Sequence, residues 1–502
     1  MVASHIQRGA LLSGSGVIRT NSLSLEFDDS VVPVVRARID YAIRVFAAIY
    51  GHPVVEPGKD ESEFRLVYGP SGRVGADTGQ IRIPALYNNI DADFRNSKAP
   101  TRFDFAGQKF PLFLGIDLDT GSPDWLGEIF LWLSGELEFS AKQRDEVGRI
   151  PFLETPFGKH GLSPRRPYAA LLMSCLENIL RGGETSVLPK APSPIAGAKH
   201  IVLPSHDIDF HFNGFRSAFV RLSKNFLIAA RIYKDSSFFR DNAKRLVSLF
   251  AGNRPGDYLF PLLDAVESRE FRSTIFPVVR RTHRRDPNYS LENIASPLSL
   301  AIVRGFSVGL HGSYRSVMEE RSLNTEAAIL GERIGKRPRA NRQHWLRFQS
   351  QRSLFREIEG AGILADSSLG FPEAVGFRNG ACFAYPPYDF ERETAHRFLE
   401  VPLVLMDGGL EAEARRSGQS AEQIADEVLH ESRSAGWGGV SVLWHNPVEP
   451  ISVPGKVNEV FWRLAEKRND VQESWLTFDQ FISEVLPRYQ QAGLLERCPA
   501  YA

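Results

Sequence analysis

The stretch Ile201-Val-Leu-Pro-Ser-His-Asp-Ile-Asp209 decides the fold prediction, because an apolar run passes directly into a polar end with two carboxylates. If residues 201–203 form a strand, the side-chain period of two places Asp207 and Asp209 on one side at its end. Placing two ionised carboxylates together in a buried site is energetically costly unless a cation binds one of them or one of them is protonated. This pattern indicates one aspartate on a metal ion and the other acting as a base. The alternative is a turn in which both aspartates cap the next helix.

Three later apolar stretches also end in polar residues and are followed by helical patterns. Such repetition of strand and helix predicts an α/β fold with a parallel sheet or barrel. In these folds ligands collect at the carboxyl ends of the strands, where the histidines would lie. The stretches are residues 273–279 before His283, residues 305–310 before His311, and residues 439–444 before His445.

A connector is predicted over Leu188-Pro-Lys-Ala-Pro-Ser-Pro-Ile-Ala-Gly197, which contains three prolines and no apolar period. The helical and alternating apolar patterns before it are typical of a small mixed α/β unit. The predicted division is residues 1–190 as an N-terminal mixed α/β domain of unknown role, 191–200 as a linker, and 201–490 as a (β/α) barrel with a helical insertion over 215–270.

The charge balance bears on possible partners, since 60 Lys and Arg face 60 Asp and Glu. With no net charge to hold a polyanion, nucleic acid is not an expected partner. Apolar stretches such as residues 110–116 are far shorter than the roughly 20 residues of a membrane span, so none is expected. The N-terminus lacks a signal-peptide pattern, and Cys175, Cys382 and Cys498 form no disulfide framework, which predicts a cytoplasmic protein. No pattern indicates an oligomeric state.

The order of these motifs resembles the polysaccharide deacetylases of carbohydrate esterase family 4, in the bacterial branch with a His-Asp-x-Asp first motif and an extra N-terminal domain. The resemblance implies a distorted (β/α) barrel and the metal-dependent removal of N- or O-acetyl groups from a sugar or glycan. The motifs are Asp-x-Asp at 207–209, His-Gly-Ser-Tyr at 311–314, Arg-x-His at 342–344, Asp-Ser-Ser-Leu-Gly-Phe at 366–371 and Leu-x-His at 443–445.

Carried over residue by residue, the resemblance assigns Asp207 as the general base and Asp209 as a metal ligand. His445 matches the general acid. Asp366 and Arg378 would orient the base and the acid. In such a site Asp207 would take a proton from water, and His445 as imidazolium would protonate the leaving amine.

The metal ligands depart from the family pattern at one position. His311 matches the first His of the His-(Ser/Thr)-x-x-His motif, but Arg315 stands where the second His would be. His344 is the predicted replacement, because residues 342–344 match the family's Arg-Pro-Pro-Tyr strand and His344 would face the pocket. The resemblance implies a divalent cation, with zinc expected, held by Asp209, His311 and His344; His283 and His206 are further candidates.

Two other functions fit the same residues. Arg315 in the second His position favours a non-catalytic carbohydrate-binding or scaffold protein that kept the barrel and lost the metal. A metal hydrolase acting on a non-sugar amide would use every residue named above and would differ only in the shape of its pocket.

Overall fold

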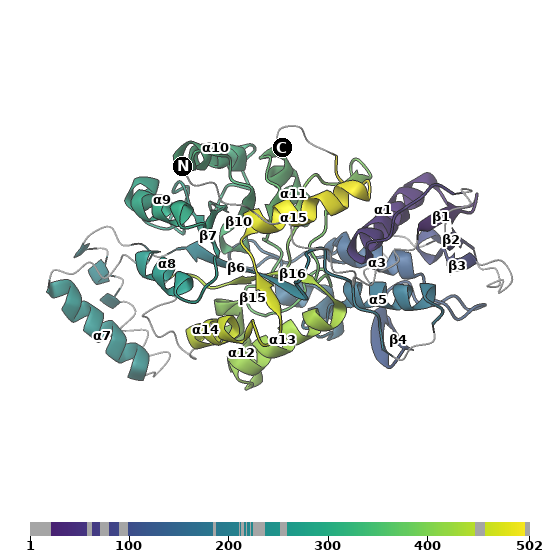
Figure 1. The fold of residues 1–502 in the computed structure, drawn as a ribbon, viewed down its shortest axis with the longest axis horizontal. Helices are drawn as coiled ribbons and strands as arrows, with labels where there is room; N and C mark the ends of the chain where they lie inside the picture. The colour runs from purple at the N-terminus through teal and green to yellow at the C-terminus, as the bar shows by residue number, and fades with distance from the viewer. Residues whose placement is uncertain are drawn as a thin grey trace, which may run out of the picture.

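The structure is a computed structural model that describes residues 22–57, 63–70, 80–89, 99–183, 187–209, 211, 215–216, 218–220, 222–223, 236–251, 259–446 and 457–496. Cys498, residues 1–8, and residues 224–235 and 252–258 of the predicted insertion lie outside this part of the chain. Figure 1 shows the N-terminal elements at one end, the main sheet in the middle and α7 (Ser236–Phe250) at the other end.

The main parallel sheet is built around β6 (His200–Ile208), in which all nine residues are buried. Burial on both faces explains why residues 201–203 read as an uninterrupted apolar run. One edge of β6 pairs with β16 (Gly438–Leu443), and the other pairs with β17 (Glu473–Trp475) and then β7 (Thr274–Pro277). The outer strands are β15 (Leu403–Met406), beside β16, and β8 (Ser307–Val308), beside β7.

A second parallel sheet has four strands and follows the first closely along the chain. Gly309 alone separates β8 from this sheet, and a side chain there would collide with the ring of Phe276 and the carbonyl of Ala340. The prediction of an α/β fold with parallel strands is confirmed, whereas the described strands of the predicted barrel pair in two separate parallel sheets and do not show a closed barrel. The strand order is β14 (Leu399–Glu400), β11 (Ala365–Asp366), β10 (Ala340–Gln343) and β9 (Leu310–Gly312).

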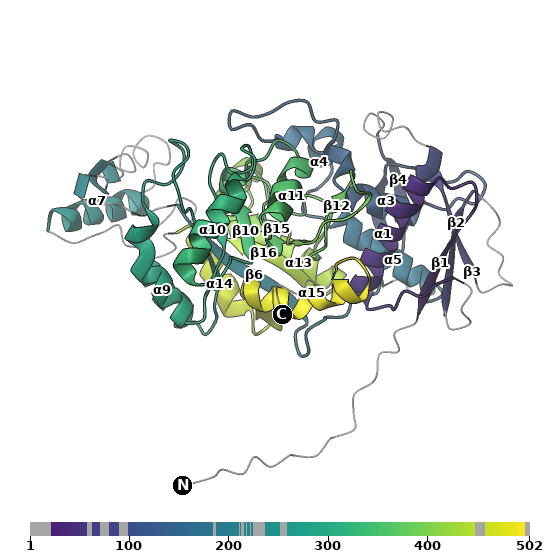
Figure 2. The ribbon, with the colours of Figure 1, turned by 90° about the horizontal axis from the view of Figure 1, so that it is seen from above.

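Helices surround the two sheets (Figures 1 and 2). In α13 (Ala421–Ala435), Ser420 and Gln423 form a capping box, and the buried face repeats at helical spacing through Ile424 and Val428. No described helix is both long and apolar enough to cross a bilayer. The other helices here are α8 (Leu259–Glu267), α9 (Ala295–Val303), α10 (Ser322–Ile334), α11 (Gln351–Gly360), α12 (Asp407–Ser417), α14 (Val457–Lys467) and α15 (Phe478–Gln491).

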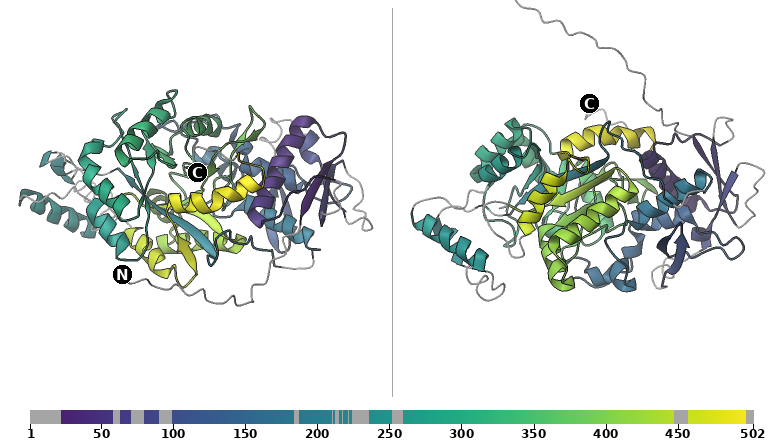
Figure 3. Two further views of the ribbon diagram at one scale, coloured as in Figure 1. Left: turned by 45° about the horizontal axis from the view of Figure 1, so that its top comes forward. Right: turned by 60° about the horizontal axis from the view of Figure 1, so that its bottom comes forward.

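The N-terminal part packs directly against the rest of the chain. Tyr41 donates a hydrogen bond to the carbonyl of Pro386 (2.8 Å), and Arg38 pairs with Glu393 (2.7 Å). Figures 2 and 3 show α15 reaching α1. Apolar side chains of both parts form one continuous core. The N-terminal elements are α1 (Pro33–Tyr50), α3 (Trp125–Leu133), α4 (Pro156–His160), α5 (Tyr168–Leu180), the parallel strands β1 (Leu23–Phe27), β2 (Phe64–Gly69) and β3 (Gln80–Pro84), and the antiparallel pair β4 (Thr101–Phe105) and β5 (Gln108–Leu112).

Glu128 of α3 is a fully buried carboxyl group in this core. Its Oε1 accepts a hydrogen bond from the Leu114 amide (2.6 Å), and its Oε2 has no hydrogen-bond partner among the described residues. Burial, which outweighs the backbone hydrogen bonds, raises the pKa of Glu128 from 4.5 to about 8.

Glu128→Gln is expected to flatten the pH dependence of stability between about pH 4.5 and 8. In that window the folded carboxyl keeps a proton that the unfolded one releases, so the unfolding free energy of the native chain falls as pH rises, by roughly a few kcal/mol over the whole window. Glutamine keeps the acceptor for Leu114 and cannot ionise. Urea unfolding at several pH values measures this, with exposed Glu466→Gln as the control. Parallel curves for Glu128→Gln and the native chain would contradict the prediction.

Candidate metal and catalytic site

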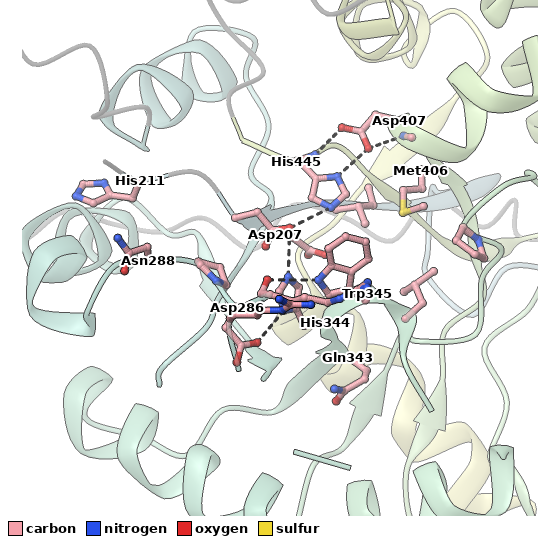
Figure 4. Close-up of a pocket in the computed structure, with 18 of the residues that line it drawn as sticks. Asp207, His211, Asp286, Asn288, Gln343, His344, Trp345, Met406, Asp407 and His445 are labelled. Atoms are coloured by element: carbon pink, nitrogen blue, oxygen red, sulfur yellow. Dashed lines mark hydrogen bonds and ion pairs between the residues drawn. The ribbon is translucent and has the colours of Figure 1, made fainter. Parts of the chain in front are cut away.

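A cavity of about 1180 Å³ opens where β6, β10, β15 and β16 end (Figure 4). Asp207 lies in β6 and Asp209 follows it directly. His344 follows β10, and His445 comes two residues after β16. The carboxyl ends of neighbouring parallel strands therefore bring these four residues to one place.

Three side chains in and beside this cavity converge on one point. The Asp209 carboxylate lies 3.6 Å from Nε2 of His311 through Oδ1, and 3.5 Å from Nε2 of His344 through Oδ2. One ligand atom from each of the three residues lies within 4.8 Å of the others. The structure thus brings together the three residues predicted as metal ligands.

Hydrogen bonds on the far side of each ring fix how the two histidines face Asp209. Nδ1 of His311 lies 2.9 Å from the carbonyl oxygen of Arg342, and Nδ1 of His344 lies 3.0 Å from Oδ1 of Asp286. Because both partners only accept, each Nδ1 carries the proton, and a neutral ring turns a bare Nε2 towards Asp209. Metal-binding histidines are held in this way by carboxylates and carbonyls.

Two atoms of this cluster that could bind a metal form no hydrogen bond with the rest of the described chain. Among the described residues, Nε2 of His311 and Oδ1 of Asp209 are buried without a hydrogen bond. Acceptors that face one another in a buried site need a cation or a proton between them. One carboxylate and two imidazole nitrogens are a donor set used by catalytic zinc, so the residues present fit a divalent cation.

The close approach of Asp209 and the histidines also shifts their pKa values. Burial would raise the pKa of Asp209, but His344, His311 and His445 hold it well below its usual range. Burial would likewise lower the pKa of His344, yet Asp209 and Asp286 raise it to about 9. Protons and a cation therefore compete for the same nitrogen.

Asp207 is held by a buried guanidinium. Arg342 donates to Oδ1 of Asp207 (3.0 Å) and to the hydroxyls of Ser205 and Ser441 (2.8 Å each). The other oxygen, Oδ2, lies 3.6 Å from Nε2 of His311 and so faces the cluster. The sequence indicated no function for Arg342, although it belongs to the Arg-x-His motif. Its position near the end of β10, two residues before His344, could have indicated that it lies at the site.

His445 is held by Asp407 (Figure 4). Its Nδ1 lies 2.8 Å from Oδ1 of Asp407, its amide donates to Oδ2 (3.0 Å), and its Nε2 lies 3.7 Å from Oδ2 of Asp209. Burial would lower the pKa of His445, but Asp407, with Asp209 and Asp207, raises it to about 10. Asp407 and Asp286 were missed from the sequence, although Asp407 also follows an apolar strand, β15.

Two predicted site residues lie elsewhere, and neither lines the described cavity. Arg378 forms a two-pronged pair with Glu138 of the N-terminal part (2.9 and 3.0 Å). Asp366 is buried at the end of β11, where it accepts from the side chain of Asn341 (2.7 Å). The structure does not bring either residue to Asp207 or His445, so the predicted orienting contacts are absent from the described part of the chain.

His283, His206 and Arg315 contact residues outside the cluster of Asp209, His311 and His344. Arg315 is half exposed and lies 3.7 Å from Glu319. His283 stacks on Tyr314 with ring centroids 4.4 Å apart. His206 is buried, and its Nδ1 bonds the carbonyl of Trp444 (2.9 Å).

A second group of possible ligands, Glu359, Asp389 and His396, lies outside the cavity. The guanidinium of Arg392 contacts both carboxylates (2.6 and 2.5 Å). Because this cation already satisfies them, the group is an ion-pair network and needs no metal.

Comparisons with known proteins add little to this geometry. No model of a known protein family matches the sequence, and no curated protein matches it. The chain is similar to a solved peptidoglycan N-acetylglucosamine deacetylase in complex with 4-naphthalen-1-yl-N-oxidanyl-benzamide, at 11% identity over 56% of this chain and 86% of that chain, with a TM-score of 0.29. A likeness of this size supports no conclusion about function, which therefore depends on the residues of the site.

Proposed function

We propose that this chain is a metal-dependent hydrolase that removes an acetyl group from an N- or O-acetylated sugar or glycan. One observation carries the proposal: Asp209, His311 and His344 converge, with Oδ2 of Asp207 3.6 Å from Nε2 of His311 and Nε2 of His445 3.7 Å from Oδ2 of Asp209. The motif resemblance supports the substrate class. Asp209, His311 and His344 would hold a divalent cation, for which zinc suits the donor set.

The chain's own residues supply two proton transfers. When bound, a divalent cation supplies Lewis acidity to the acetyl carbonyl and to water. Oδ2 of Asp207 accepts the proton of the attacking water, while Arg342 keeps Oδ1 in place. Nε2 of His445 gives a proton to the leaving nitrogen or oxygen, and Asp407 stabilises its imidazolium from the other side.

Trp345 offers a face on which a sugar ring can stack. It lines the cavity next to His344 and is 41% exposed, in contrast to the buried aromatic side chains of the core. Its φ of 64° is strained for a residue with a side chain. The exposed ring of Trp345 in the cavity favours a sugar over a non-sugar amide as the substrate.

Arg315 favoured the non-catalytic alternative, because it leaves the family motif one histidine short. His344 offers a second imidazole nitrogen to the cluster, which supports a metal-binding enzyme over this alternative.

Acetate release from acetylated sugars tests the proposed function. The zinc-loaded protein is expected to release acetate from N-acetylglucosamine derivatives, chitooligosaccharides or O-acetylated sugars, measured by NMR. A chelator should abolish the activity and added zinc should restore it. An acetyl-lysine peptide serves as the non-sugar amide. Release from the peptide alone would contradict the sugar substrate, and no release from any acetylated compound by protein with stoichiometric zinc would contradict the function.

A further inference from the structure

The segment after β7 places three arginines on the wall of the same cavity. Arg281, Arg284 and Arg285, here called the arginine wall, all line it. Arg281 and Arg284 are exposed and Arg285 is half-buried, so their guanidinium groups are accessible to a ligand in the cavity.

Among the described residues, no carboxylate forms an ion pair with the arginine wall. Arg281 donates to the side-chain oxygen of Asn288 (2.9 Å), and Arg285 lies over the ring of Trp345 (5.4 Å). Within the described part of the chain, none of the three arginines has a carboxylate within 4.0 Å. The acidic residues of the cavity have other partners: Asp207 faces Arg342, Asp209 faces His311 and His344, Asp286 holds His344, Asp407 holds His445, and Glu411 lies near Arg415.

The arginine wall and the metal cluster belong to one binding site. Asp286, which follows Arg285 directly, holds Nδ1 of His344 (3.0 Å). Trp345, which follows His344, lies beneath the guanidinium of Arg285. A sugar bound at Trp345 would therefore lie close to both His344 of the cluster and Arg285 of the arginine wall.

We infer that the substrate of the proposed deacetylation is an anionic acetylated sugar, whose phosphate or carboxylate group binds the arginine wall. This inference rests on the proposed function. Guanidinium groups match the oxygens of phosphates and carboxylates in two-pronged hydrogen bonds. Three neighbouring cations without counter-charges repel one another, and an anion among them removes that repulsion. The zero net charge of the chain does not oppose this, because the excess is local.

Calorimetric titration with deacetylated ligands measures anion binding without turnover. The ligands are glucosamine 1-phosphate and glucosamine 6-phosphate for the phosphate group, muramic acid for the carboxylate, and glucosamine as the reference that carries the same amine but no anionic group. At least one anionic ligand is expected to bind about 10-fold more tightly than glucosamine, since a hydrogen bond to a charged group is worth about that factor. The preference should weaken as salt is added.

Arg284→Gln and Arg285→Gln are each expected to remove most of this preference, lowering the ratio of anionic-ligand affinity to glucosamine affinity within the same variant by about 10-fold. Arg333→Gln on the exposed side of α10 is the matched control and should change neither affinity. Equal binding of all four ligands, or unchanged preference in both wall variants, would overturn the inference even if acetate is released. Tight anion binding that is lost in the variants, without acetate release from any sugar, would uphold the anion site and contradict the proposed deacetylation instead.

Discussion

Asp209→Ala is expected to remove the bound divalent metal almost completely. Asp209 is the carboxylate that lies within 3.7 Å of Nε2 of His311, His344 and His445. Losing only a residue that supports a ligand typically costs about 10–100-fold in metal affinity, so losing the central ligand should cost more than about 100-fold. Metal content after dialysis against zinc buffer, measured by mass spectrometry, should fall from about one zinc per chain to near zero. Acetate release should fall with it.

The control for this experiment is Asp264→Asn, which removes an exposed carboxylate of α8 that pairs with Arg304. This variant should retain its metal and its activity. An Asp209→Ala protein that keeps stoichiometric zinc would show that the cation binds elsewhere.

Asp207→Asn is expected to lower kcat by about 100- to 10,000-fold while the metal content stays the same. The amide cannot accept the proton of the attacking water, and Oδ1 of Asp207 is engaged with Arg342 rather than with the cluster. Steady-state acetate release and metal analysis on the same preparation separate these two readouts. Normal kcat in this variant would exclude Asp207 as the base.

The same substitution also leaves the buried guanidinium of Arg342 without its charged partner. Breaking a buried ion pair from one side costs roughly 3–5 kcal/mol, so the variant should unfold at a lower urea concentration. Asp207→Asn combined with Arg342→Met removes both charges and should recover part of the stability but none of the activity. If the double variant is more stable than Asp207→Asn and equally inactive, the loss of kcat is not a consequence of lost stability.

The strand-end pattern of the sequence predicted most of the cluster for a simple geometric reason. Asp207, Asp209, His311, His344 and His445 lie within two residues of the carboxyl ends of parallel strands, and these ends meet at one edge. An apolar run that is followed directly by an aspartate or a histidine can be recognised in the sequence.

Partners that act across the fold could not be predicted in the same way. Asp286 and Asp407 hold histidines through hydrogen bonds from loops and helix starts, where a single aspartate has no distinguishing spacing. Arg378 lies between two glycines in the sequence, but its partner Glu138 lies 240 residues away. Closure of a barrel depends on hydrogen bonds between the edge strands of the two sheets, which no local pattern encodes.

Anomalous diffraction at the zinc edge from crystals of the zinc-loaded protein locates the bound cation. We expect one strong peak at about 2.0–2.2 Å from Nε2 of His311, Nε2 of His344 and the carboxylate of Asp209. A peak at another group of side chains, with these three residues free of metal, would contradict the proposed metal site.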